Sequence, residues 1–156
     1  MNERIYIGTT RFNTSTFGEN AKWRKDHNWE GCIYGLNKKI PPNIPKNSLI
    51  YVLEMNNETN TIEGIGLIRN FTNYEYTVKI YKDVGYNRFI YNSKFRADRS
   101  TIKYKKVMLL LDKIVFYGSR HYKRGQGITT INVSSFPSTY DKIFNLFFVK
   151  LFNIRS

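Results

Sequence analysis

Residues 48–68 constrain the fold more than any other stretch, because they encode two strands joined by a short turn. Ser48 to Met55 form a nearly continuous apolar run, which is typical of a buried strand. Residues 56–60 are polar and predict a turn. Residues 61–68 alternate between apolar and other side chains, so they predict the returning strand. A β-hairpin is therefore expected near the centre of the fold.

Further strands and helices are expected on both sides of this hairpin. Runs rich in β-branched and aromatic residues predict strands at 5–10, 32–35, 74–81, 88–95 and 128–131. Helices are predicted at 16–27, at 107–115 and at 138–156, with apolar spacings of three and four in the second and Gly118 at its end. The sequence thus predicts one α+β domain that spans residues 1–156.

The last predicted helix is unusually apolar. Ser138 is expected to cap its first turn, with Asp141 three residues further on. Its body, residues 143–152, is apolar nearly all round, so the helix is expected to be deeply buried or covered by a partner. Self-association into a homodimer through residues 138–156 is one interpretation.

Positive charge is concentrated in one part of the chain. The net charge is +13, and residues 81–125 hold twelve basic and three acidic side chains. A surplus of this size repels itself, and nucleic acid or an anionic membrane relieves that repulsion. The charge distribution therefore favours a nucleic-acid partner, RNA or DNA.

Residues 117–127 interleave basic and aromatic side chains between flanking glycines, as single-stranded nucleic-acid binding requires. The candidates for phosphate contact are Arg120, His121, Lys123 and Arg124, and the candidates for base stacking are Tyr117 and Tyr122. A solvated loop without a ligand is the alternative interpretation of this stretch.

A second basic group precedes the middle helix. Its members are Lys94, Arg96, Arg99, Lys103, Lys105 and Lys106. Lys94, Arg96 and Arg99 are expected to extend a track of phosphate contacts, and the alternative is that the group only keeps the domain soluble.

Residues suited to catalysis are scarce. The chain has two histidines and one cysteine, and no zinc-ligand spacing, phosphate-binding glycine loop or HExxH motif occurs. Cys32 follows Gly31 at the start of a predicted strand and is interpreted as a buried structural thiol. Gly64 and Gly66 lie inside a strand, where they favour close packing or a bulge. A non-catalytic protein without a metal or cofactor is expected.

No membrane association is expected either. The N-terminus has no long apolar run, and residues 143–154 are too short to cross a bilayer. These features predict a soluble, intracellular protein of the cytoplasm, the nucleus or a virion.

Trp29 precedes a glycine-containing strand start, Glu30-Gly31-Cys32, and fits either the core or the wall of a base pocket. This segment, the strand at 50–53 and the returning strand Ile62-Glu63-Gly64-Ile65-Gly66-Leu67 resemble the PUA-like superfamily, in particular its EVE and YTH branches. The resemblance covers roughly residues 5–95, and the C-terminal third departs from it.

The resemblance implies a small mixed β-barrel with packed helices that binds nucleic acid, and it implies a pocket for one flipped or modified base. Carried over by position, the pocket residues are Trp29 as a wall, Asn13, Thr14 and Ser15 as contacts to the base edge, and Tyr34 and Tyr91 on nearby strands. The second wall in such families lies where Phe89, Tyr91 and Phe95 stand here, and no tryptophan occurs there.

Four functions remain open from the sequence. The first is a PUA-like module that holds one base, and the second is a protein that coats or compacts nucleic acid without sequence preference. The third is an enzyme acting on nucleic acid, with His121 as general acid or base beside Arg120 and Lys123. The fourth is a protein-interaction module that uses the apolar C-terminal helix.

Overall fold

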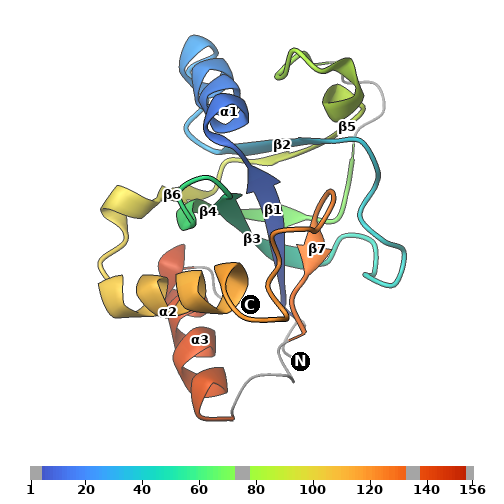
Figure 1. The fold of residues 1–156 in the computed structure, drawn as a ribbon. Coiled ribbons are helices and arrows are strands. Elements are labelled where there is room, and N and C mark those ends of the chain that lie inside the picture. Colours follow the sequence, from blue (N-terminus) through green and yellow to red (C-terminus); the bar gives the residue numbers. More distant parts are fainter. Residues whose placement is uncertain (1–4, 73–77, 133–137, 154–156) are drawn as a thin grey trace.

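A mixed five-stranded sheet forms the centre of the computed structural model, which describes residues 5–72, 78–132 and 138–153 (Figure 1). The strand order is β6-β4-β3-β1-β7. The strands are β1 (Tyr6–Phe12), β3 (Leu49–Asn56), β4 (Thr61–Arg69), β6 (Arg96–Asp98) and β7 (Thr129–Thr130). β1 is parallel to β3, and the other pairs are antiparallel. The predicted strands at 5–10, 48–55 and 61–68 are confirmed, and two residues of the run at 128–131 pair as β7.

The β3–β4 hairpin has the predicted boundaries and one irregularity. Glu54 lies opposite Gly64, and a bulge follows between Glu54 and Met55. Every residue of β3 after Leu49 is buried, as its continuous apolar run predicts. Ile50 and Val52 contribute to one core cluster, while Tyr51, Leu53 and Met55 contribute to another. The period of two therefore places β3 between two separate cores.

A second sheet of two antiparallel strands, β2 (Cys32–Leu36) and β5 (Phe89–Ser93), adjoins the first. The chain passes directly from β5 into β6 of the larger sheet. At the crossing, the Ser93 hydroxyl donates a hydrogen bond to the Leu67 carbonyl, and Leu67 N donates to Phe95 O at 3.2 Å. The α+β class is confirmed, and within the described ranges the strands form two adjoining sheets and no closed barrel.

The helices divide between the two cores. α1 (Thr14–Asp26) lies on the side of β2 and β5, while α2 (Lys105–Phe116) and α3 (Ser138–Leu151) pack together on the other side of the larger sheet (Figure 1). Asn13 caps α1, because its side chain accepts from Thr16 N at 2.8 Å while the Thr16 hydroxyl accepts from Asn13 N. α2 ends at Phe116, because Tyr117 is already extended, and Gly118 follows with a φ of +86°.

The predicted strand at 74–81 is not seen where the structure describes it. Residues 73–77 lie outside the described residues, and residues 78–81 have no strand structure. Ile80 N and Tyr81 N both donate to the Asn87 side-chain oxygen, each at 2.9 Å. The Asn87 side chain therefore accepts hydrogen bonds from the backbone N–H groups that would otherwise pair with a neighbouring strand.

α3 is apolar on two sides, as its sequence predicts. Phe144, Phe147 and Phe148 are buried, whereas Ile143, Leu146 and Val149 are about half exposed, by 44%, 56% and 45%. The helix begins at Ser138 itself, so the capping position precedes it and lies outside the described residues. Across the described part of the chain, the helices are too short or too polar to cross a lipid bilayer.

Candidate functional site

A buried network of charges joins the two sheets. The Arg96 guanidinium binds the Glu54 carboxylate, with Nη2 at 2.7 Å from Oε1, and the Tyr34 hydroxyl donates to Glu54 Oε2 at 2.6 Å. The side chains of Arg96 and Glu54 are only 5% and 3% exposed. Burial alone would lower the pKa of Arg96, but the Glu54 charge and hydrogen bond outweigh it and raise that pKa. Burial also raises the pKa of Tyr34.

Gly64 and Gly66 make room for this network on one face of β4. A Cβ atom at Gly64 would lie 2.5 Å from Arg96 Nη2, and one at Gly66 would lie 2.2 Å from the Tyr34 hydroxyl. The prediction that these glycines permit close packing is therefore confirmed, and the groups that approach them are side chains of β6 and β2. Cys32 lies beside them and is buried, as predicted; burial raises the pKa of its thiol to about 11.

Arg96 and Arg99 are not available to a phosphate, which corrects the predicted phosphate track. Arg96 is enclosed by Glu54 and also pairs with Asp98 at 3.1 Å. Arg99 donates to both carboxylate oxygens of Asp112, at 3.0 and 2.7 Å, and to Ile62 O. Both cations are therefore paired with carboxylates of the fold, Arg96 in the interior and Arg99 with its side chain 28% exposed. Lys94 is exposed, with its amine over the Phe95 ring.

A cavity of about 340 Å³ opens where β1 and β2 end, beside the start of α1 and the loop before β7. Its aromatic lining comes from three segments: Phe12 at the end of β1, Tyr34 in β2, and Tyr81 and Tyr86 in the connection to β5. Gly35 is essential to this arrangement, since a Cβ there would lie 2.3 Å from the Tyr86 carbonyl oxygen. The absence of a side chain at Gly35 therefore lets the segment that carries Tyr86 lie directly against β2.

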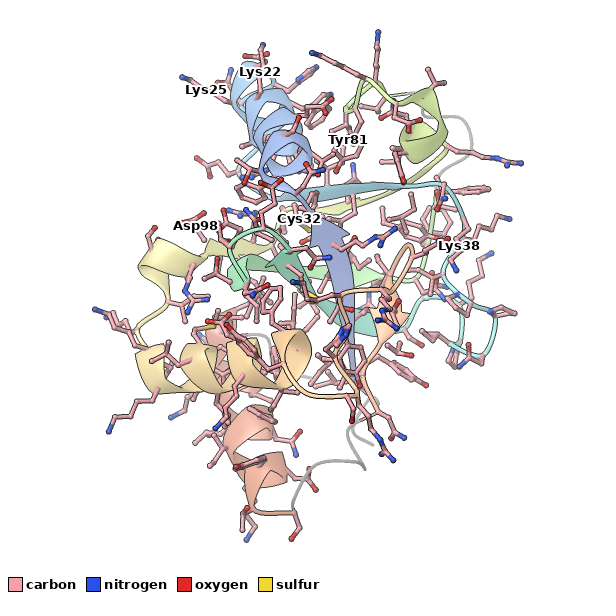
Figure 2. The ribbon with its side chains drawn as sticks, in the orientation of Figure 1. Lys22, Lys25, Cys32, Lys38, Tyr81 and Asp98 are labelled. Carbon is pink, nitrogen blue, oxygen red and sulfur yellow. The ribbon has the colours of Figure 1, made fainter. Side chains whose placement is uncertain are left out.

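Amide and hydroxyl groups line the rest of the cavity. They belong to Thr10, Asn13, Thr16, Asn37, Asn57 and Gln126. Arg11 also lines it and is exposed. The exposed Lys38 follows Asn37, and its stem lies against Gly127, within 3.5 Å of where a Cβ would stand (Figure 2). Two cations therefore lie at or beside the cavity.

Two of the six predicted pocket residues, Asn13 and Tyr34, line this cavity. Thr14 and Ser15 do not line it, because they form the first turn of α1 and not a loop. Trp29 packs against the core, and its ring N–H donates to Cys32 O at 3.0 Å. Tyr91 is buried in the same core, where its hydroxyl accepts from Ile40 N at 3.1 Å.

The predicted basic loop is tied to the β3–β4 turn. Lys123 Nζ donates to the Asn60 side chain at 2.8 Å, and the Asn57 side chain donates to Lys123 O at 2.9 Å. Lys123 N donates to His121 Nδ1 at 3.2 Å. These bonds hold the loop so that its last residues, Gln126 and Gly127, reach the cavity.

The candidate residues of this loop differ in exposure. Arg120 and Arg124 are exposed, and neither has an ion-pair partner among the described residues. Tyr117 is also exposed, by 57%, and remains a candidate for stacking. Tyr122 is half-buried against the core around α2, and its backbone N–H donates to Val115 O.

Sequence reasoning missed Arg11, Lys38, Asn57, Tyr81 and Tyr86. They come from four separate segments of the chain, and no shared motif or spacing links those segments. In the sequence, these residues could be recognised as candidates only by their chemical type and position. They are aromatic, amide or basic residues at the ends of predicted strands or in turns.

Among the described residues, no group of three histidine, cysteine or acidic side chains is placed to hold a metal ion. No family model, no curated protein and no solved structure matches this chain.

Proposed function

We propose that this protein is a non-catalytic nucleic-acid-binding module that takes one base of RNA or DNA into the cavity at the ends of β1 and β2. One observation carries the proposal: a single cavity combines aromatic surfaces, amide groups and adjacent cations. Aromatic faces stack on bases, amides bond to base edges, and cations pair with phosphates. Such a cavity suits a nucleotide better than an apolar ligand or a peptide.

The size of the cavity supports a single base. Small-molecule sites usually measure roughly 300–1,000 Å³, and this cavity, at about 340 Å³, lies near the lower limit. A base within a duplex is stacked and paired, so it must leave the helix before it enters such a site. Single strands are therefore the preferred ligand.

The proposal includes the PUA-like resemblance, with two adjoining sheets in the described ranges in place of a closed barrel. The order of β1, α1, β2 and the β3–β4 hairpin supports it, as does the passage of β5 into β6 between the two sheets. The base site, however, is proposed at Asn13, Tyr34, Tyr81 and Tyr86, and Trp29 is proposed as part of the core.

Phosphates are proposed to contact Arg11 and Lys38 near the cavity, and Arg120 and Arg124 on the adjoining loop. His121 is proposed as a binding residue because its Nδ1 accepts from Lys123 N, which leaves the ring hydrogen on Nε2, where it can be donated to a phosphate. Binding is expected to weaken as salt rises, because each neutralised phosphate releases counterions. A protein that only coats nucleic acid would share this salt dependence but would not distinguish a strand with bases from one without them.

The test is fluorescence anisotropy with six-nucleotide single strands of RNA and DNA and with matched duplexes, at two salt concentrations. A variant with Arg11→Ala and Lys38→Ala is expected to bind single strands at least about tenfold more weakly at low salt, and the slope of log affinity against log salt should fall by about two. The matched control is Lys22→Ala with Lys25→Ala, which removes the same charge from the outer part of α1 (Figure 2).

The control variant is expected to bind nearly as tightly as the unmodified protein. Failure of the unmodified protein to bind any strand at low salt would refute the proposed function. If the two double variants lost the same amount of affinity for single strands, net charge and not the cavity would determine binding.

A second candidate function is self-association, which the exposed side of α3 favours. Ile143, Leu146 and Val149 follow one another at a spacing of three and are about half exposed, by 44–56%. Sedimentation velocity is expected to show a dimer that Leu146→Lys converts to a monomer, because a charge in the centre of an apolar contact is costly. Asn145→Lys, an exposed neighbour with the same added charge, is the control. A monomer at every concentration would exclude this candidate.

A further inference from the structure

We infer that the Tyr81 hydroxyl donates a hydrogen bond to an acceptor atom of the bound base and thereby selects which base edge fits the cavity. The inference rests on the proposed function and makes it more specific. The inference requires that the bound base carry an acceptor, either a ring nitrogen or a keto oxygen. This acceptor must lie on the edge of the base that faces α1 and the connection to β5.

Tyr81 is one of the residues that line the cavity, and it is only 4% exposed. Asn20 Nδ2 donates to the Tyr81 hydroxyl oxygen at 2.9 Å, so the tyrosine accepts in this bond. No acceptor for its own hydrogen occurs among the described residues. Buried hydroxyls normally find a partner for that hydrogen, so the missing acceptor is one that a ligand can supply.

The roles in this hydrogen bond cannot be exchanged. Asn20 Nδ2 also donates to Ile33 O at 2.7 Å, and Asn20 Oδ1 accepts from Arg24 Nε at 2.9 Å. A backbone carbonyl can only accept and a guanidinium can only donate, so both partners fix the same orientation of the amide. Asn20 therefore donates its N–H group to the Tyr81 hydroxyl oxygen. The hydroxyl hydrogen of Tyr81 takes no part in this bond.

Tyr34, the other buried tyrosine of the cavity, is in the opposite situation. Its hydroxyl donates to the Glu54 carboxylate at 2.6 Å, away from any ligand. Of the two buried tyrosines, only Tyr81 can donate to a base. Burial raises the pKa of Tyr81, so the hydroxyl keeps its hydrogen at any ordinary pH.

Tyr81 is also held rigidly. Its backbone N–H donates to Asn87 Oδ1 at 2.9 Å, and Asn87 Nδ2 donates to the Tyr81 carbonyl at 2.7 Å. Lys82 N donates to Glu19 of α1 at 2.6 Å. A donor fixed before binding loses little entropy when the ligand arrives, so its contribution to selectivity is large. A site with a buried hydrogen-bonding group also rejects ligands that leave the group unpaired.

The experiment compares Tyr81→Phe with Tyr91→Phe. Both variants remove one hydroxyl from a buried tyrosine that accepts a single hydrogen bond, but Tyr91 does not line the cavity. The probes are single-stranded hexamers of each base in RNA and DNA, together with an abasic hexamer of sugar and phosphate alone. Thermal melting confirms that each variant is folded.

Tyr81→Phe is expected to weaken the tightest hexamer by about fivefold to thirtyfold, as the loss of one hydrogen bond predicts. It should also reduce the differences in affinity among hexamers of different bases. The affinity for the abasic hexamer should not change. Tyr91→Phe should leave all affinities within about twofold, because it touches no ligand.

Unchanged base preferences in Tyr81→Phe would overturn the inference while leaving the proposed function intact. An equal loss for the abasic hexamer would also overturn it, since that result would show general damage to the site. Unmodified protein that binds the abasic hexamer as tightly as the others would refute both the inference and the base cavity.

Discussion

Glu54→Ala is expected to lower the free energy of unfolding by about 3–5 kcal/mol, as removal of one partner of a buried ion pair usually does. Glu54 accepts from Arg96 Nε and Nη2 and from the Tyr34 hydroxyl, at distances between 2.6 and 3.2 Å. Without the carboxylate, the Arg96 charge stays buried with only the more exposed Asp98 as its partner. Chemical denaturation, followed by circular dichroism, measures the change.

The double variant Glu54→Leu with Arg96→Met is the control for this prediction. It removes both charges together, so no unpaired ion remains, and it should be more stable than Glu54→Ala alone. If Glu54→Ala lowered the unfolding free energy by less than about 1 kcal/mol, the network would contribute no more than an exposed ion pair does. That result would contradict the arrangement described here.

Gly66→Ala is expected to lower the free energy of unfolding by about 3–5 kcal/mol, although it adds only one methyl group. The added Cβ would lie 2.2 Å from the Tyr34 hydroxyl and 2.8 Å from Cys32 Sγ. Overpacking of a core costs about 1–3 kcal/mol. Displacement of Tyr34 would also break its bond to the Glu54 carboxylate, and a hydrogen bond to a charged group contributes about 1.5–3 kcal/mol.

A double-mutant cycle with Tyr34→Phe identifies the cause of this loss. Because phenylalanine lacks the hydroxyl that the methyl group would meet, the two changes together should cost less than the sum of their separate effects. Gly18→Ala is the matched control: nothing lies within 4 Å of a Cβ there. It should stabilise α1 by about 0.5–1 kcal/mol. Strict additivity of Gly66→Ala and Tyr34→Phe would contradict the predicted clash.

Patterns confined to a few neighbouring residues predicted most of the secondary structure. The apolar run of β3 and the alternation in β4 identified the hairpin, because side chains of a strand point to opposite faces with a period of two. Apolar residues at spacings of three and four identified α2, and a long apolar body after a capping serine identified α3. The exception is Val78 to Tyr81, whose strand-like composition was overridden when Asn87 took the backbone donors of Ile80 and Tyr81.

The site was predicted less well, because its residues meet only after folding. Of the predicted pocket residues, Asn13 and Tyr34 line the cavity, while Tyr81, 47 positions after Tyr34, lines it without having been predicted. Arg96 was grouped with solvent-facing cations because its neighbours in sequence are basic. Its partner Glu54 lies 42 residues away, on a strand that no local pattern connects to β6.

The sequence alone determined the α+β class, the hairpin, the close packing at Gly64 and Gly66 and the buried state of Cys32, since each depends on local periodicity, residue size or hydrophobicity. Tertiary structure decided which cations stay exposed and which are neutralised inside. It also decided which buried tyrosine has no acceptor for its hydroxyl hydrogen among the described residues, and that a cavity forms where two strands end. The physical reason is that burial, pairing of charges and the direction of a hydrogen bond depend on groups from distant segments, and only the folded chain brings those segments together.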